Sequence, residues 1–297
     1  MKIGFIGAGK MGFTLGKHFS SCKDESIKLL GYYSRNCESA KEAAKFTDTN
    51  YYANVTDLVN DSDAIFITVP DGQIAVVADD LKKHNCYLEH KILCHTSGAL
   101  SSHVFSGMGN HVYGYSIHPI YAVNSKTESY INFQDSFITI EGHPRYLNDF
   151  VELFSNLGHG VKIISADDKE KYHSAAVFSS NLVIGLYHMA TGILEQCGFE
   201  QEEAERALKP LFQNNANNLY KSNCFNALTG PVARCDTDTV KKHLRVLEEE
   251  EKMVYRLLSE ELIKIVDGKN EFDYSLLKEL MRGGNDNEEN SSDICAG

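Results

Sequence analysis

Side chains that can transfer protons or bind anions are concentrated at three places along the chain. These are HTSG at 95–98, HP at 118–119 and KYHSAAVFSSN at 171–181. A histidine can polarise a carbonyl group or protonate a developing alkoxide, and a Ser–Gly turn can donate hydrogen bonds to a carboxylate. These residue types indicate acid–base chemistry on a small polar compound, provided that the fold brings the three places together.

A glycine-rich loop, GAGKMG at 7–12, follows an apolar run at the N-terminus and opens a helical pattern. The G-x-G-x-x-G spacing between a strand and a helix is typical of dinucleotide-binding sites. The first glycine permits a tight turn, the second lets the backbone approach a pyrophosphate, and the third lets the helix pack on the strand. Free N–H groups at the helix N-terminus then bind phosphate. The cofactor contacts expected here are Gly7, Gly9, Lys10, Met11 and Gly12.

The second predicted strand ends in YYSRN at 32–36, where an NAD site would carry Asp or Glu for the ribose 2′-hydroxyl. Ser34 and Arg35 stand there instead, and both can bind a 2′-phosphate. The sequence therefore predicts NADP (NADPH) rather than NAD as the cofactor. Val69, Pro70 and Thr96 follow two later strands and are expected to line the rest of the cofactor's path.

The elements that must position these residues follow from the apolar pattern of the first half of the chain. Short β-rich runs alternate with helical segments as far as residue 165, which predicts an α/β fold with a doubly wound, mostly parallel Rossmann sheet. The predicted strands are 2–6, 27–33, 64–69, 91–94, 112–117, 136–140 and 161–165, and the predicted helices are 10–22, 38–46, 73–84 and 144–157. His95, Ser97 and His118 lie at the ends of neighbouring strands, so they should converge at one edge of the sheet.

After residue 165 the pattern becomes entirely helical, which predicts a second, all-helical domain. The expected helices run from 167 to 196, from 201 to 219, from 236 to 266 and over 273–282, with Asp236 as an N-cap. The predicted domains are thus a cofactor-binding domain over 1–165, a helical substrate and dimerisation domain over 166–283, and an acidic, disordered tail over 284–297.

The composition narrows the classes of partner. The chain has 297 residues and a net charge of −12, which argues against nucleic acid and anionic membranes as partners. The N-terminal sequence begins directly with a strand pattern, so we expect no leader peptide, and we also expect no long apolar span. We expect no metal site, because the eight cysteines form no CxxC pair and no zinc-ligand spacing. Free thiols and the absence of a signal peptide favour a cytoplasmic location.

The chain resembles a known group at HTSGA (95–99), HP (118–119), KYHSAAVFSSN (171–181) and LTGPVARCDTDTV (228–240). It is similar to an uncharacterised Rossmann-like NADP oxidoreductase family within the 6-phosphogluconate-dehydrogenase-like superfamily. More distantly it resembles pyrroline-5-carboxylate reductase, prephenate dehydrogenase, the β-hydroxyacid dehydrogenases and deazaflavin-dependent NADP reductase. This resemblance implies hydride exchange between NADP and a small substrate in an interdomain cleft, in a dimer formed through the helical domains.

The resemblance also suggests roles for individual residues. The β-hydroxyacid dehydrogenases carry a Lys on the first long helix of the second domain, with an Asn one turn later. Lys171 lies on the corresponding helix, but Ala175 stands one turn later, and Asn181 lies about 15 Å along the helix axis by the usual rise per residue. The catalytic candidates are His118, Lys171 and Ser97, and the candidates for contact with substrate or partner subunit are Asn181 and Arg234.

Two functions are compatible with these features. The first is an NADP-dependent oxidoreductase that exchanges hydride with a small, anionic carbonyl, imine or alcohol compound. The second is a non-catalytic NADP(H)-binding redox sensor or assembly partner, suggested by the missing Lys–Asn pair and the acidic tail. Each predicted role has a structural alternative: His118 could end a strand by bonding to a backbone carbonyl, and Arg234 could be an ordinary surface residue.

An apolar stripe on the predicted helix over 167–196 favours a homodimer over packing within one chain. The stripe consists of Val183, Leu186, Tyr187, Ile193 and Leu194.

Overall fold

The computed structural model describes residues 1–22, 27–84, 86–269 and 271–283, so the predicted acidic tail lies outside the described residues. These residues form two compact units, Met1–Val183 and Ile184–Gly297. The first unit extends past residue 165, where strands give way to helices in the sequence, because the helix that begins at Lys169 bonds to the sheet. Each unit is described separately below.

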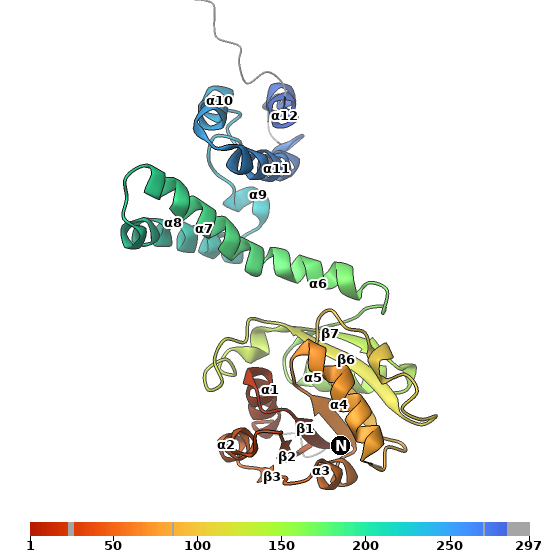
Figure 1. Ribbon diagram of the computed structural model, residues 1–297. Coiled ribbons are helices and arrows are strands. Elements are labelled where there is room, and N and C mark those ends of the chain that lie inside the picture. The colour runs from red at the N-terminus through yellow and green to blue at the C-terminus, as the bar shows by residue number, and fades with distance from the viewer. Residues whose placement is uncertain (23–26, 85, 270, 284–297) are drawn as a thin grey trace, which may run out of the picture. The chain divides into compact units, whose positions relative to one another are not determined.

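The first unit is built on one eight-stranded sheet with the order β3-β2-β1-β4-β5-β6-β7-β8 (Figure 1). Every neighbouring pair is parallel except β6 and β7, which are antiparallel. The strand order reverses direction between β1 and β4, and ligands of such sheets bind at that point. The strands are β1 (Lys2–Ile6), β2 (Lys28–Tyr33), β3 (Asn50–Tyr51), β4 (Ala64–Ile67), β5 (Ile92–His95), β6 (Tyr113–Ile120), β7 (Phe137–Gly142) and β8 (Gly160–Ile163).

Helices cover both faces of this sheet and create two separate apolar cores. One core takes Phe13 and Phe19 from α1, small residues from α2 and Phe150 from α5. The other takes Leu58 from α3 and Ile74 from α4. Strands covered on both faces need apolar residues at successive positions, which is why β1 and β4 barely alternate. The helices are α1 (Lys10–Ser20), α2 (Cys37–Thr47), α3 (Val55–Asp61), α4 (Asp71–Lys83), α5 (Leu147–Asn156) and α6 (Lys169–Phe178).

The predicted fold class is confirmed, and all seven predicted strands are present with ends shifted by a few residues. Two elements, β3 and α3, are present that the sequence pattern did not predict. The strand β3 has only two residues, both exposed, and so leaves no apolar pattern to detect. The helix α3 has seven residues and buries only two of them, which is too few for a clear helical periodicity.

The second unit is entirely helical. Its core packs α10 against α11 and α12 through Val240, Leu244, Ile263 and Leu277. The helices after α6 are α7 (Asn181–Gln196), α8 (Gln201–Lys221), α9 (Cys224–Ala227), α10 (Thr237–Val246), α11 (Glu249–Val266) and α12 (Ser275–Met281). Asp236 caps α10 as predicted, because its carboxylate accepts a hydrogen bond from the Thr239 N–H at 3.0 Å.

Two long helices predicted from the sequence are each divided. The expected helix over 167–196 is interrupted after Phe178, where α6 ends and α7 begins at Asn181. The expected helix over 236–266 is interrupted before Glu249 by a capping box, in which Glu248 and Glu251 each bond the other's backbone N–H. The acidic run 248–251 was predicted to lie within one continuous helix, but it marks the start of a new one. Negative charge at that position is stabilised by the positive end of the helix dipole.

The segment Lys169–Gln196 is long and apolar enough to cross a membrane by length and composition alone, contrary to the expectation of no long apolar span. One such segment is weak evidence for a membrane protein, because the core helix of a soluble protein passes the same test. The first turn of the segment also bonds to the sheet: Lys169 is buried there and Tyr172 contacts His118.

The close contact between α1 and β2 gives a test of this packing. A Cβ at Gly16 would collide with the hydroxyl of Tyr32, which is fully buried and donates to the Gly12 carbonyl at 3.2 Å. We expect Gly16→Ala to lower the free energy of unfolding by about 1–3 kcal/mol, because an extra methyl group forces apart a filled core. Gly72→Ala is the matched helical control, since a Cβ there meets nothing within 4 Å. Urea unfolding of both variants measures the difference, and equal stability of the two would contradict this packing.

Candidate functional site

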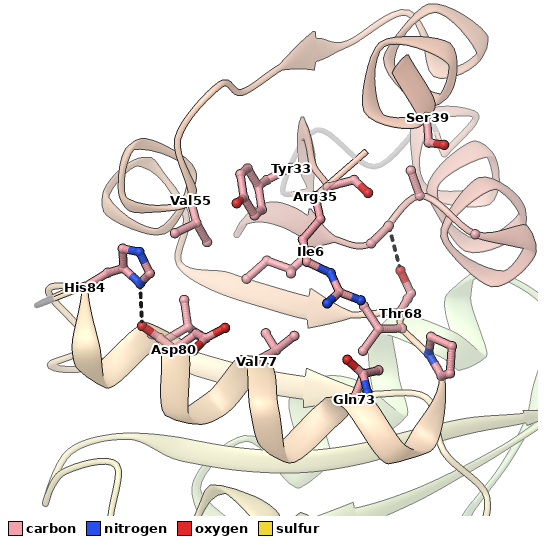
Figure 2. A pocket seen from close by; sticks show the side chains of 17 residues that line it. Ile6, Tyr33, Arg35, Ser39, Val55, Thr68, Gln73, Val77, Asp80 and His84 are labelled. Atoms are coloured by element: carbon pink, nitrogen blue, oxygen red, sulfur yellow. Dashed lines mark hydrogen bonds between the residues drawn. The ribbon is translucent and has the colours of Figure 1, made fainter. Parts of the chain in front are cut away.

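A pocket of the first unit lies at the carboxyl ends of β1, β2 and β4, where the strand order reverses (Figure 2). It has a volume of about 260 Å³. Its lining residues come from the glycine loop, the end of β2 and one face of α4, and are Ile6, Gly7, Ala8, Gly9, Tyr33, Ser34, Arg35, Ser39, Val55, Thr68, Val69, Pro70, Gln73, Val77, Asp80, Leu81 and His84.

The glycine loop has the geometry that a pyrophosphate requires. Gly7 has a φ of +107°, and a Cβ there would lie 2.7 Å from the Thr68 carbonyl oxygen. A Cβ at Gly12 would lie 2.7 Å from the Gly7 carbonyl oxygen, so α1 can pack this closely only with glycine. At Gly9 the nearest atom would be 3.8 Å away, which leaves space beside the loop backbone.

The N-terminus of α1 is also free to bind an anion. No side chain caps the helix at Gly9, and its first turn contains no acidic residue. The N–H groups and the positive end of the helix dipole therefore have no competing negative partner from a cap. The residues present thus fit a dinucleotide phosphate group.

The end of β2 supplies the polar and cationic groups predicted there. Ser34 and Arg35 both line the pocket, and the Arg35 guanidinium extends toward Thr68 across the pocket (Figure 2). Asn36 is instead the N-cap of α2, where its side chain accepts from the N–H groups of Glu38 and Ser39. The end of β2 therefore presents the positive charge of Arg35 at the position that an adenosine ribose would occupy. It presents no carboxylate there.

The other predicted cofactor residues are divided. Val69 and Pro70 line the pocket, whereas Lys10, Met11 and Gly12 lie on the first turn of α1 and Thr96 follows β5, all outside the lining. The lining residues on one face of α4 and at its C-cap were not predicted, among them Gln73, Val77 and His84. Their helical spacing on one face of α4 was the available signal.

A second polar cluster lies at the carboxyl ends of β5 and β6, and Ser97 links it to the pocket. The Ser97 hydroxyl donates to Asp71 Oδ2 at 2.6 Å, and Asp71 directly follows the pocket residue Pro70. The same hydroxyl accepts hydrogen bonds from the N–H groups of Ala99 and Leu100. Ser97 is buried and its hydroxyl is fully engaged, so this geometry gives it the role of holding the loop rather than contacting a reactant.

The centre of the cluster is Lys169, which the sequence analysis did not single out. Its Nζ donates to the Ser97 carbonyl oxygen at 2.9 Å and to Ser116 Oγ at 2.6 Å. Only 1% of the residue is exposed, and burial lowers the pKa of Lys169 to about 8, against the opposing influence of Glu141 and Asp71. Lys169 precedes His173 by one helical turn, so a Lys-x-x-x-His spacing was the signal available in the sequence.

His95 and His118 both lie in the cluster but differ in their freedom to react. His95 is fully buried; its Nδ1 accepts from the Ser97 N–H, and its Nε2 therefore donates to the Ser101 carbonyl. Burial lowers the pKa of His95 to about 4. His118 bonds through Nδ1 to the Tyr172 hydroxyl at 2.6 Å, while its Nε2 lies beside Gly98. His118 is therefore held by a side chain, and not by the backbone carbonyl that the alternative interpretation required.

The remaining predicted residues lie apart from this cluster. Lys171 is exposed on α6, two positions after the buried Lys169. Asn181 is exposed at the start of α7, where its side chain accepts from the Ser180 hydroxyl, and Arg234 is exposed on the loop before α10. The described structure therefore brings together His118, Ser97, His95 and Lys169, and leaves Lys171 outside; the roles predicted for Asn181 and Arg234 stay predictions.

The imidazoles of the buried His95 and the half-buried His118 predict how stability responds to acid. Burial is the largest cause that lowers the pKa of His95 to about 4 and of His118 to about 3. Between pH 6.5 and these values the unfolded chain binds protons that the folded chain does not, so stability falls as the pH is lowered. We expect each residue to remove at most about 1.4 kcal/mol of unfolding free energy per pH unit. Urea unfolding at about pH 7 and about pH 5.5 measures the loss, and equal free energies would contradict the lowered pKa values of these two imidazoles.

Comparisons with known proteins agree with this description. Residues 2–96 match the family described as NADP oxidoreductase, coenzyme F420-dependent, and residues 136–262 match a domain of unknown function (DUF2520). The search among curated proteins found no match to the sequence.

Solved structures from several organisms share the fold. A protein from Thermotoga maritima is 24% identical with a TM-score of 0.69, and the match covers 90% of this chain and 99% of that chain. A protein from Bacteroides fragilis described as an NADP oxidoreductase is 24% identical with a TM-score of 0.62, covering 89% and 98%. The 1-pyrroline-5-carboxylate reductase of Streptococcus pyogenes is 18% identical with a TM-score of 0.60, covering 90% and 97%.

The glycine loop, the pocket and the sheet order thus agree with the sequence match over the N-terminal third of the chain, and at these identities the solved structures support the fold alone. Two family models thus match separate parts of the chain: the family described as NADP oxidoreductase, coenzyme F420-dependent, over residues 2–96, and DUF2520 over residues 136–262.

Proposed function

We propose that the protein is an NADP-dependent oxidoreductase that exchanges hydride with a small, anionic carbonyl, imine or alcohol compound. The observation that carries this proposal is the hydrogen bond between Asp71 and Ser97, because it connects the end of the dinucleotide pocket to the His118–Lys169 cluster. A nicotinamide ring that leaves the pocket past Pro70 would meet this cluster at the ends of β5 and β6.

Each part of the cofactor has residues suited to hold it. The loop Gly7–Gly9 and the N-terminus of α1 would bind the pyrophosphate, and Ser34 and Arg35 would bind the 2′-phosphate. Bound NADP(H) supplies the hydride chemistry, while the protein orients it and stabilises charge on the substrate. The positive charge of Lys169 favours an anionic substrate nearby through the field that it creates.

The alternative, a non-catalytic NADP(H) sensor, would not require a buried lysine and a neutral histidine beside the nicotinamide end of the pocket. Groups with shifted pKa values at such a place are typical of catalytic sites. A panel of small 2-oxo acids, cyclic imines and hydroxy acids, assayed by the absorbance of NADPH, separates the two functions. Tight NADPH binding without turnover of any compound would favour the sensor.

Arg35 gives the test of cofactor choice. We expect Arg35→Ala to weaken NADPH binding by about 10- to 100-fold, since a hydrogen bond to a charged phosphate contributes about 1.5–3 kcal/mol. The affinity for NADH should change far less, because NADH lacks the 2′-phosphate. Isothermal titration with both dinucleotides measures the two effects. Arg145→Ala is the matched control, because Arg145 lies outside the pocket lining and stacks near Tyr113. Equal losses for NADPH and NADH would disprove the assignment of Arg35.

We also propose that the protein is a homodimer formed through its helical part. Large apolar side chains on α7 and α8 are exposed in the single chain, including Ile184 at 69% and Leu211 at 60%. Exposed apolar groups at this density mark association surfaces.

The acidic net charge and the free cysteines among the described residues support a cytoplasmic location, without nucleic-acid or membrane partners.

The dimer is tested by the mass in solution. We expect the wild-type protein to show twice its 33.2 kDa chain mass by light scattering at micromolar concentration. The double variant Ile184→Glu/Leu186→Glu should shift toward the monomer mass, because it places charges within the apolar surface of α7. Tyr87→Glu is the control, an equally exposed aromatic site in the first unit. A monomeric wild-type protein would rule out the proposed dimer.

A further inference from the structure

A chain of three side chains from three elements ends on His118. Thr139 Oγ1 donates to the Tyr172 hydroxyl oxygen at 2.9 Å, and this hydroxyl lies 2.6 Å from His118 Nδ1. Thr139 stands directly opposite His118 in the antiparallel pair β6–β7, and Tyr172 approaches both from the first turn of α6. The register of the sheet and the start of α6 therefore fix the relative positions of these three side chains.

The direction of the hydrogen bonds follows from what each group can donate. Thr139 Oγ1 can donate either to the His118 carbonyl at 3.3 Å or to the tyrosine oxygen at 2.9 Å, and the shorter contact favours the tyrosine oxygen as the acceptor. The tyrosine proton then goes to His118 Nδ1, which must be unprotonated to accept it. Burial, and next the charge of Lys169, lower the pKa of His118 to about 3, so the ring is neutral and its single proton is on Nε2.

The Nε2 edge of the His118 ring packs closely against Gly98, where only glycine fits. A Cβ at Gly98 would lie 2.9 Å from His118 Nε2 and would also meet the ring of His173. Nε2 has no hydrogen-bond partner among the residues that the structure describes. A donor without a partner, in the cluster that Ser97 links to the dinucleotide pocket through Asp71, is suited to an oxygen atom of a reactant.

The charges around His118 favour the same kind of reactant. Lys169, His173 and Tyr172 approach it from α6, and His95 lies on the adjacent β5. The nearby carboxylates are already used: Glu141 accepts from the N–H and hydroxyl of Ser102, and Asp71 accepts from Ser97. A protonated imine carries a positive charge and an N–H donor, so it would meet another donor and a lysine. A carbonyl oxygen that gains negative charge would be stabilised by both.

We propose that Tyr172 and Thr139 are positioning residues that hold His118 as its Nε2–H tautomer, and that the reacting group of the substrate is consequently a carbonyl or alcohol oxygen rather than an imine nitrogen. The substrate class rests on the proposed function. In the reduction, the carbonyl carbon gains hydride from NADPH, the C=O π bond opens, and the oxygen, hydrogen-bonded to His118, takes its proton from solvent. The products are NADP⁺ and an alcohol.

The tautomer is tested by two-bond ¹H–¹⁵N NMR of protein labelled with ¹⁵N-histidine, with the His118 signals assigned by their loss in His118→Gln. We expect wild-type His118 to show a protonated Nε2 and an unprotonated Nδ1 at neutral pH. Tyr172→Phe should convert this into a mixture of both tautomers and lower kcat several-fold, with the KM for NADPH unchanged. An Nδ1–H signal in the wild type, or an unchanged spectrum in Tyr172→Phe, would overturn the proposal.

Thr139 provides a second pair of variants in case Tyr172→Phe folds poorly. Thr139→Val removes the hydroxyl that directs the tyrosine proton and should also admit the second tautomer, whereas Thr139→Ser retains the hydroxyl and should restore the wild-type spectrum. Thr139→Val with an unchanged spectrum would exclude the relay. The spectra are read without turnover, so their outcome is separate from that of the proposed function.

The substrate class is tested with NADPH and two sets of probes, small 2-oxo acids and cyclic imine carboxylates. We expect kcat/KM to be at least about tenfold higher for the best carbonyl compound, in proportion to about 1.4 kcal/mol of transition-state stabilisation. Higher activity on a cyclic imine would overturn the inference on substrate class. Absence of turnover with both sets would count against the proposed function and leave the NMR result to decide the role of Tyr172.

Discussion

The buried ammonium group of Lys169 is the interaction on which the arrangement of the polar cluster depends. Its hydrogen bonds join the loop after β5, through the Ser97 carbonyl, to the hydroxyl of Ser116 on β6. Removing a charge from water is costly unless the group is paired and hydrogen-bonded, so both partners must stay in place for the lysine to remain there. The first turn of α6 is thereby fixed to the sheet, and Tyr172 and His173 are fixed with it. Burial, and next the same charge, lower the pKa of His118 and keep the ring neutral.

Much of this arrangement could be predicted because it depends on backbone constraints that leave a sequence pattern. Gly7 and Gly12 are required by contacts that no side chain could make, and a strand, loop and helix in that order identified them. The pocket residues at the end of β2 could also be predicted, since Ser34 and Arg35 stand where an NAD site would carry a carboxylate. The convergence of His118 with Ser97 followed from the parallel order of β5 and β6, which places their carboxyl ends together.

The rest depends on tertiary contacts that spacing does not reveal. Lys171 and Lys169 are both near the start of a helix, and the sequence offers no measure of which one turns toward the sheet; the structure buries Lys169 and exposes Lys171. The resemblance to an enzyme group with a Lys–Asn pair favoured Lys171 only weakly, because Ala175 stands one turn later. The division of the helix predicted over 236–266 was missed for a related reason, since a capping box within an acidic run contains the same residue types as a solvated helix face.

The single antiparallel pair of the sheet shows how topology determines the chemistry of one imidazole. In a wholly parallel sheet the strand beside β6 would arrive after a crossover, with its carboxyl end next to His118. Because β7 runs the other way, its interior residue Thr139 faces His118 across a fixed register, and Glu141, two residues further, reaches the loop at Ser102. One strand therefore supplies both the hydroxyl at the start of the His118 relay and the carboxylate that partly balances the charge of Lys169. The reversal of one strand thus links the proton position on His118 to the electrostatics of the whole cluster, and a change at β7 should affect both together.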